Sequence, residues 1–225
     1  AKTLQQAILP NKSHIDKAFK SFILYRPKEV VSGDFYWFRE ISQPNSEASF
    51  YFMAAVDCTG HGVPGAFMSI IGNRILNEII ESQVYEPDQI LTELNKRVID
   101  VLNQDENDNN DGMDVALVKF ERVHNEKTIV TFAGAKRPLY YFSTKDNALL
   151  TVKGDRKSIG GVRAINRNQN YNSHELLLST NDKVYLTSDG IIDQHGPDRK
   201  RFGSPRLKEL LENNQGEFRV INASE

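Results

Sequence analysis

The stretch at residues 53–68 (MAAVDCTGHGVPGAFM) limits most strongly what this chain can fold into. An apolar run ends on the carboxylate of Asp57, turns through the Gly-rich residues 59–62, and continues as a helix near Pro64. Proline is tolerated in the first turn of a helix, so Pro64 fits that position. A carboxylate at the end of a strand, beside a Gly-rich turn into a helix, suits a hard metal ion or an anion. The stretch alone does not identify a function.

Two runs rich in aromatic and β-branched residues, 34–41 and 50–57, flank the turn-forming residues 42–46. This pattern predicts an antiparallel hairpin. If the hairpin is symmetric about its turn, Asp34 and Asp57 lie opposite each other at its open end. A shift of one residue in the register would turn one of these two side chains to the other face of the sheet.

Apolar residues at helical spacing predict two long amphipathic helices, at 64–83 and 87–102. Residues 1–9 predict a short helix that ends before Pro10, and residues 205–211 predict a last helix. In the second long helix, the residues expected to face inward are Ile90, Leu94, Val98 and Val101.

The remaining apolar runs predict short strands, and residues 143–174 are expected to be rich in loops. Long helices among antiparallel strands, without the strand–helix alternation of parallel sheets, predict an α+β sandwich. The strands are expected at residues 22–26, 115–120, 128–132, 139–142, 176–178 and 183–187.

The composition excludes several classes of protein. The chain has 225 residues, with 28 basic against 30 acidic side chains, so neither a nucleic acid nor an anionic membrane surface is an expected partner. Its single cysteine, Cys58, excludes an internal disulfide and is typical of a reducing compartment. No apolar run approaches the ~20 residues that span a bilayer. We therefore expect a cytoplasmic domain, which could belong to a membrane-anchored or multidomain sensor protein.

Three aspartates are candidates for one site: Asp34 opens a strand, Asp57 closes its partner, and Asp189 closes a later strand just before Gly190. Hard divalent ions such as Mg²⁺ or Mn²⁺ prefer oxygen ligands, which aspartates at strand ends can supply. The alternative for each aspartate is ordinary turn chemistry, since Asp favours turns and commonly precedes Gly there. Convergence of all three at one edge of a sheet favours the metal ion.

Two residues next to Asp57 leave alternatives open. His61, between two glycines, is a candidate general acid, an anion contact at a helix N-terminus, or a turn residue at the helix start. The turn or helix-start role is the favoured interpretation. Cys58 could be a nucleophile, but no base partner is apparent in the sequence, so a small buried side chain is favoured.

The acidic loop at 105–112 does not match a calcium-binding EF-hand. Counted from Asp105, the sixth position is Asn110 instead of Gly, and the twelfth is Ala116 instead of Glu. We therefore expect a solvated loop. Asp114 begins the strand that follows, so it could share one end of a hairpin with Lys136 and Arg137. Both cations are either phosphate contacts or plain surface residues. Arg26 is a further candidate phosphate contact, because a guanidinium fork matches phosphate oxygens.

The chain contains five short motifs, at residues 31–36 (VSGDFY), 56–65 (VDCTGHGVPG), 111–117 (DGMDVAL), 132–135 (FAGA) with 138–140 (PLY), and 186–193 (LTSDGIID). In this order and spacing they resemble the SpoIIE/RsbU-like branch of the metal-dependent protein serine/threonine phosphatases, the type-2C superfamily. Each motif alone is modestly specific, but the five in order are highly specific, and they cover nearly the whole chain.

The resemblance implies two stacked antiparallel sheets flanked by helices, an α-β-β-α sandwich, with a two-metal Mn²⁺ or Mg²⁺ site at one end. In this family pattern Asp57 matches the bridging aspartate, and the backbone carbonyl of Cys58 matches a neighbouring ligand. Asp34 and Asp189 match acidic positions of two further motifs. The implied reaction is hydrolysis of phosphoserine or phosphothreonine in a protein by metal-activated water that attacks phosphorus directly.

The resemblance also implies partners. Family substrates are often small STAS-type anti-anti-sigma proteins, and the catalytic domain commonly follows a sensor or receiver region through a helix. We therefore expect residues 1–9 to end such a linker helix, and residues 10–225 to form the phosphatase-like domain of a bacterial signalling protein. A homodimer is a further expectation, because some relatives dimerise or switch through helices like those at 64–83 and 87–102.

The chain departs from the family pattern near its end. The family usually finishes with a strand that carries an Asp-Asp pair, which supplies another metal carboxylate, but no aspartate follows Asp198 here. We expect that strand to be missing from this chain and one metal site to be weakened. One alternative is therefore a weakly active or inactive regulatory module that binds a phosphoprotein. A small-molecule phosphatase is another, because convergent carboxylates do not choose between a phosphopeptide and a phosphate ester.

Overall fold

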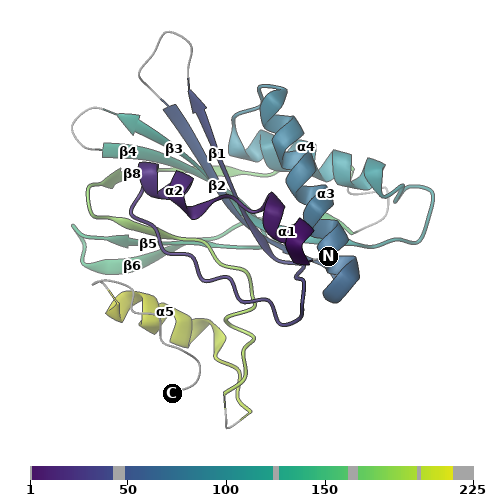
Figure 1. Ribbon diagram of the computed structural model, residues 1–225. Helices are drawn as coiled ribbons and strands as arrows, with labels where there is room; N and C mark the ends of the chain where they lie inside the picture. The colour runs from purple at the N-terminus through teal and green to yellow at the C-terminus, as the bar shows by residue number, and fades with distance from the viewer. Residues whose placement is uncertain (1, 43–48, 124–126, 162–166, 197–198, 215–225) are drawn as a thin grey trace.

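Two antiparallel β-sheets lie face to face in the computed structural model, which describes residues 2–42, 49–123, 127–161, 167–196 and 199–214 (Figure 1). The larger sheet contains, in spatial order, β1 (Phe35–Ser42), β2 (Ser49–Cys58), β3 (Gly112–Val123), β4 (Lys127–Ala135) and β8 (Ser173–Ser179), with β7 (Ile159–Gly160) paired to β3. The smaller sheet contains β6 (Ala148–Val152), β5 (Leu139–Ser143) and β9 (Lys183–Tyr185).

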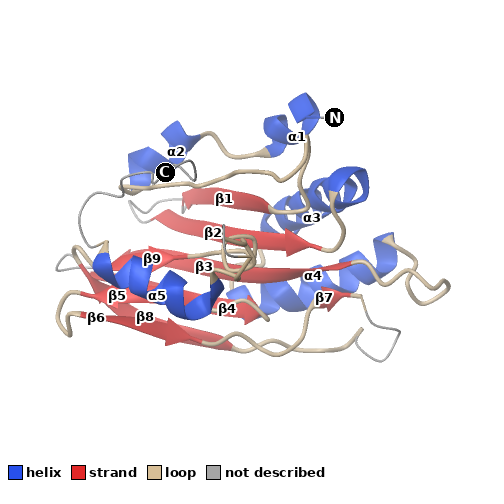
Figure 2. Cartoon of the chain, turned by 90° about the horizontal axis from the view of Figure 1, so that it is seen from below, coloured by secondary structure: helices blue, strands red, loops and turns tan. Residues whose placement is uncertain are grey.

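Helices cover both outer faces of the two sheets. They are α1 (Lys2–Ile8), α2 (Lys12–Ala18), α3 (Gly62–Glu81), α4 (Pro87–Val101) and α5 (Gly203–Asn213). The long helices α3 and α4 lie on the larger sheet, whereas α5 lies beside β5 and β6 on the opposite side (Figures 1 and 2). None of the helices in the described part of the chain is long and apolar enough to cross a membrane.

Three apolar clusters hold these layers together, because helices and sheets must bury their apolar faces against a neighbouring layer. Phe52 of β2 packs with Leu94 of α4 in the cluster between the larger sheet and the long helices. Phe132 of β4 and Leu139 of β5 belong to the cluster between the two sheets. In the third cluster, Leu207 of α5 packs against β5. The layer order is therefore the α-β-β-α sandwich that the sequence predicts.

The pairing of the first strands brings distant acidic residues to one end of the larger sheet. Phe35 pairs with Val56, which is the symmetric hairpin register expected from the sequence. Asp34 therefore precedes β1 at the end where β2 reaches Asp57. β2 also pairs with β3, and there Asp57 lies directly opposite Asp114.

Several local predictions differ from the structure. Residues 22–26 belong to neither sheet, although their apolar run predicts a strand, and the sequence does not predict the short helix α2. The segment predicted as loop-rich, 143–174, contains β6 and β7, which gain their ladder partners from β5 and β3. The strand predicted at 183–187 ends at Tyr185. These differences concern short segments, in which tertiary pairing outweighs local pattern.

The sequence pattern predicts only part of the buried faces of the long helices. Ile90, Leu94 and Val98 are fully buried as predicted, but Val101 is 54% exposed. Val101 is the last residue of α4, and the next residue, Leu102, packs against the core in its place. On α3, the exposed residues that belong to its apolar pattern are Phe67 and Ile70.

We predict that Val98→Ala lowers the free energy of unfolding by about 2 kcal/mol, because two buried methyl groups are lost and a cavity remains. Val101→Ala on the same helix removes the same atoms from an exposed position and is expected to change stability by less than about 0.5 kcal/mol. Urea unfolding of both variants measures the difference. Equal losses in the two variants would contradict the burial of this face of α4.

Candidate functional site

Four carboxylates gather at one end of the sandwich. Asp57 lies at the end of β2, Asp114 lies opposite it near the start of β3, and Asp34 directly precedes β1. Asp189 follows β9 of the smaller sheet, and its backbone N–H donates a hydrogen bond to Asp57 Oδ2 (3.2 Å). The structure thus brings together the three aspartates that the sequence predicts for one site, and adds Asp114.

A single guanidinium nitrogen contacts three of these carboxylates. Arg137 Nη2 lies 2.8 Å from Asp57 Oδ2, 2.7 Å from Asp189 Oδ2 and 3.3 Å from Asp114 Oδ2. The side chain of Arg137 is 13% exposed, so the plain surface role left open for it by the sequence is excluded. Its Nε atom is buried and has no hydrogen-bond partner within the described residues. A buried cation therefore lies among carboxylates of both sheets.

The backbone around Arg137 is held by a close approach of two glycines. The carbonyl oxygen of Arg137 lies so near Gly134 and Gly154 that a Cβ atom at either position would collide with it. Lys136, the preceding residue, takes a positive φ of 56° and donates from its backbone N–H to the Asp155 carbonyl (2.7 Å). This turn after β4 therefore directs the Arg137 side chain toward β2 and β3.

Asp114 has further partners besides Arg137. The hydroxyl of Ser158 donates to Asp114 Oδ1 (2.6 Å), and Lys136 Nζ lies 3.8 Å from the same oxygen. The predicted grouping of Asp114 with the two cations is therefore confirmed. The Lys136 side chain remains half-exposed, and Asp114 Oδ1 is the oxygen of the cluster that its ammonium group approaches.

Asp34 is positioned through its backbone. Its N–H donates to Ser32 Oγ (3.1 Å), and its carbonyl accepts from the hydroxyl of Tyr25 (3.2 Å). Its carboxylate lies beside Gly190, the residue that follows Asp189. The preceding Gly33 lies so close to the carbonyls of Cys58 and Gly60 that a Cβ atom there would be within 3 Å of both. Tight packing of the two loops thus places Asp34 next to the cluster.

The charges of the cluster shift its pKa values in opposite directions. Burial, followed by the nearby charge of Asp34, raises the pKa of Asp57 from 3.8 to about 8, although Arg137 acts in the other direction. Burial also acts against ionisation of Asp189, but the hydrogen bonds from Arg137 and Asp57 outweigh it and lower the pKa of Asp189 below its ordinary value. Arg137 stays charged, because its carboxylate partners outweigh burial and raise its pKa.

The residues beside Asp57 take structural positions. Cys58 is buried, and burial raises the pKa of its thiol well above the ordinary value, so it is a neutral thiol. Its backbone carbonyl faces Gly33. His61 is the N-cap residue of α3, where its side chain makes no capping hydrogen bond, and its exposed imidazole contacts Glu29 (2.8 Å). Arg26 is exposed, in the extended segment that also carries Tyr25.

The donor chemistry of this cluster fits a divalent cation. Its side chains offer oxygen donors, which Mg²⁺ and Mn²⁺ prefer, and three carboxylates already converge on one positive group, Arg137 Nη2. Within the described residues, no three or more His, Cys, Asp or Glu side chains are arranged to hold a metal ion by themselves. The carboxylates are therefore arranged around the guanidinium.

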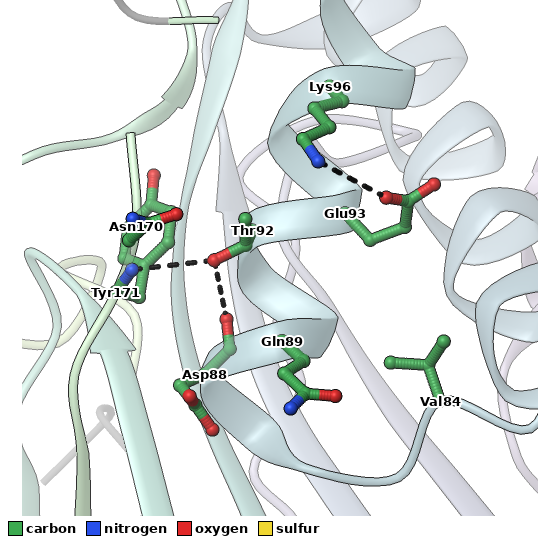
Figure 3. A pocket seen from close by; sticks show the side chains of 8 residues that line it. All are labelled: Val84, Asp88, Gln89, Thr92, Glu93, Lys96, Asn170 and Tyr171. Atoms are coloured by element: carbon green, nitrogen blue, oxygen red, sulfur yellow. Dashed lines mark hydrogen bonds and ion pairs between the residues drawn. The ribbon is translucent and has the colours of Figure 1, made fainter. Parts of the chain in front are cut away.

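A separate cavity of about 310 Å³ lies along α4 (Figure 3), and none of the four aspartates of the cluster lines it. The contacts within it join α4 to the loop beside it or stay on the helix, such as the hydrogen bond from the Tyr171 N–H to Thr92 Oγ1 (3.4 Å) and the ion pair of Lys96 with Glu93. They satisfy groups of the helix and its neighbouring loop, and they offer no converging catalytic groups. Its lining residues are Val84, Asp88, Gln89, Thr92, Glu93, Lys96, Asn170 and Tyr171.

The raised pKa of Asp57 predicts a pH-dependent effect on the stability of the metal-free protein. Between about pH 4 and about pH 8 the folded state holds a proton on Asp57 that the unfolded state has lost, so the free energy of unfolding falls as the pH rises. The substitution Asp57→Asn removes the ionisable group, and with it this fall in the free energy of unfolding at higher pH. We expect the variant to be more stable than the wild type at about pH 8.5, and the difference to shrink toward about pH 4.

Urea unfolding in EDTA at the two pH values measures this difference between variant and wild type. Differences of equal size at both pH values would contradict the raised pKa of Asp57.

Comparisons with known proteins agree with the resemblance of the motifs. The family model of Stage II sporulation protein E (SpoIIE) matches residues 48–219. The SiaA-PP2C domain of Pseudomonas aeruginosa is 32% identical, with a TM-score of 0.77 over 94% of this chain and 78% of that chain. No curated protein matches the chain.

Two more distant structures share the fold. The RsbU and RsbW domains of Rv1364c from Mycobacterium tuberculosis are 18% identical, with a TM-score of 0.57 over 83% of this chain and 46% of that chain. RsbX in complex with magnesium is 12% identical, with a TM-score of 0.52 over 84% of this chain and 83% of that chain. The family model and the similarity to SiaA cover most of the sequence, and the chain therefore belongs to the SpoIIE family and has the fold of a PP2C-type phosphatase domain.

Proposed function

We propose that this chain is a Mn²⁺- or Mg²⁺-dependent phosphatase domain that hydrolyses phosphoserine or phosphothreonine in a protein. The observation that carries the proposal is the convergence of Asp57, Asp114 and Asp189 on one positive group, with Asp34 beside them. Such a concentration of buried negative charge favours the binding of a cation. Membership of the SpoIIE family and the PP2C-type fold support the same chemistry.

The residues have separable roles in this proposal. Asp34, Asp57, Asp189 and the Cys58 carbonyl are the candidate metal ligands, with two ions expected. A bound divalent cation would supply Lewis-acid activation of water and would neutralise charge on the phosphoryl group. The guanidinium of Arg137 is the proposed contact for phosphate oxygens, which its planar fork matches. Arg26 is a further candidate phosphate contact, because it also carries a guanidinium fork.

Cys58 is the nucleophile that the sequence brings into question, but its thiol is buried and its pKa is raised well above the ordinary value. A neutral thiol is a poor nucleophile compared with a thiolate. Direct attack of water on phosphorus is therefore the reaction that this site favours.

The substrate is proposed to be a phosphoprotein rather than a small phosphate ester. The aspartates lie outside the cavity along α4, and also outside a second cavity of about 450 Å³ between the N-terminal helices and Tyr36. Asp189 is 42% exposed, so the cluster is open on one side to a large partner. A STAS-type anti-anti-sigma protein is the proposed substrate, with control by an upstream sensor or receiver domain and a homodimer as further proposals.

A regulatory module without activity is the second candidate, and one observation favours it. Arg137 Nη2 already contacts three carboxylates and supplies part of the positive charge that a metal ion would bring. The predicted absence of the family's Asp-Asp strand concerns residues 215–225, which lie outside the described part of the chain.

We predict that the chain hydrolyses p-nitrophenyl phosphate in a Mn²⁺-dependent manner and that EDTA abolishes this turnover. Asp57→Asn should lower kcat/KM at least about 100-fold, because loss of a supporting group alone often costs 10- to 100-fold in metal sites. A phosphothreonine peptide assayed in parallel should give the higher kcat/KM. EDTA-insensitive turnover, or full turnover in Asp57→Asn, would contradict the mechanism.

Asp16→Asn is the matched control for this assay. Asp16 pairs with Lys12 on α2, and the adjoining Phe19 contacts Tyr51, which lies about 20 Å along β2 from Asp57 at ~3.3 Å per residue. Its activity should equal that of the wild type. Folded wild-type protein without turnover at saturating Mn²⁺ would favour the regulatory module.

His61→Ala is expected to change kcat/KM by less than about tenfold, because His61 is exposed at the start of α3 and contacts Glu29. A general acid would contribute about 100-fold or more. A loss of that size in the same assay would show that His61 transfers a proton to the leaving group.

A further inference from the structure

We propose that Arg137 is an internal counter-ion that competes with the divalent cation for the same carboxylate oxygens. This inference rests on the proposed function and extends it, because it assigns to one residue of the chain the control of metal affinity. Arg137 Nη2 contacts Asp57 Oδ2 and Asp189 Oδ2 while no metal ion is bound. It must move away before these oxygens can bind a metal ion.

The geometry supports direct competition. One nitrogen atom lies within 2.8 Å of two carboxylates, Asp57 and Asp189, and within 3.3 Å of a third, Asp114. These three aspartates come from β2, β3 and the loop after β9, so the guanidinium joins both sheets. Two cations at one oxygen would repel each other, and the repulsion is strong where water is excluded. Asp57, Asp114 and Arg137 are all less than one-fifth exposed.

The other atoms of Arg137 indicate that its position can change. The Nε atom is buried without a hydrogen-bond partner in the described residues, and a buried donor without a partner costs free energy. The guanidinium is therefore not fully satisfied where it lies. Its backbone, by contrast, is held by Gly134 and Gly154. The side chain can consequently move while its anchor stays in place, and a phosphate oxygen near the cluster would offer it a new acceptor.

Competition has consequences that ordinary structural support does not have. Removal of the guanidinium charge should leave three clustered carboxylates, two of them mostly buried, without their counter-ion, and so destabilise the metal-free protein. The same removal should strengthen metal binding, because the metal ion no longer has to displace a cation. If the variant loses stability in its metal-free form and keeps it in its metal-bound form, linkage requires that it bind the metal ion more tightly.

The test is isothermal titration of Mn²⁺ into metal-free Arg137→Gln and wild-type protein, with thermal unfolding in EDTA and at saturating Mn²⁺. We expect Arg137→Gln to bind Mn²⁺ more tightly, by about 5- to 100-fold, to unfold at a lower temperature in EDTA, and to gain more from Mn²⁺ than the wild type does. Arg137→Lys keeps the positive charge without the planar fork and should give an intermediate Mn²⁺ affinity.

Two matched controls separate direct competition from a general change of charge. Arg74→Gln removes an exposed guanidinium on α3 that pairs with Glu78, and should leave Mn²⁺ affinity unchanged. Lys136→Gln removes the half-exposed cation 3.8 Å from Asp114, and should change the affinity much less than Arg137→Gln does. Equal effects of Lys136→Gln and Arg137→Gln would overturn the inference in favour of a general field.

The outcomes distinguish this inference from the proposed function. Mn²⁺ binding by the wild type, with equal or weaker binding by both Arg137 variants, would overturn the counter-ion role and leave the metal site intact. Absence of Mn²⁺ binding in the wild type and in every variant would overturn both. If Arg137→Gln folds only in the presence of Mn²⁺, that result supports the role, because a metal ion then replaces the lost charge. If Arg137→Gln does not fold even with Mn²⁺, the Mn²⁺ affinity of Arg137→Lys decides. Tighter binding than in the wild type supports the counter-ion role, and equal or weaker binding overturns it.

Discussion

The electrostatic balance between Arg137 and the aspartates around it governs the end of the sandwich where the site lies. Carboxylates that are close together and poorly hydrated repel one another, and one of them then keeps its proton unless a cation lies among them. Arg137 supplies that charge from the turn after β4, and even so the pKa of Asp57 is raised to about 8. The cluster is thus only partly compensated by the protein itself, which is the physical reason to expect a metal ion there.

The fold produces this cluster through strand register. β2 lies at the centre of the arrangement, because β1 and β3 both pair with it and both place an aspartate at its end. The smaller sheet adds Asp189, whose backbone N–H donates to Asp57 and so connects the two sheets at the site. The long helices on one face and α5 on the other bury the remaining surfaces of the sheets. The apolar layers therefore position the acidic ends without contributing to the chemistry.

Much of this arrangement could be predicted from the sequence, for identifiable reasons. The hairpin of β1 and β2 has a short connection and a symmetric aromatic pattern, so its register, and with it the meeting of Asp34 and Asp57, follows from local residues. The motif order was sufficient to identify the family, which the family model and the similarity to SiaA confirm. The metal-binding and catalytic roles of the individual residues remain predictions.

Other features depend on contacts between segments far apart in the chain. Asp114 was grouped with Lys136 and Arg137, but not assigned to the aspartate cluster, because α3 and α4 separate β2 from β3 and no local pattern determines their register. The sequence does not predict the burial of Arg137, because that burial depends on the approach of Gly154 to Gly134, two residues in separate segments. The exposure of Val101 depends on where α4 ends, and helix ends are poorly defined by periodicity alone.

A crystal structure of the chain with Mn²⁺, in which anomalous scattering locates the ion, would show whether a metal ion takes the place of Arg137 among the aspartates. We expect an anomalous peak among the carboxylates of Asp34, Asp57 and Asp189, with the Arg137 guanidinium moved away from Asp57 Oδ2. Absence of a peak at saturating Mn²⁺, with Arg137 still between Asp57 and Asp189, would contradict this expectation.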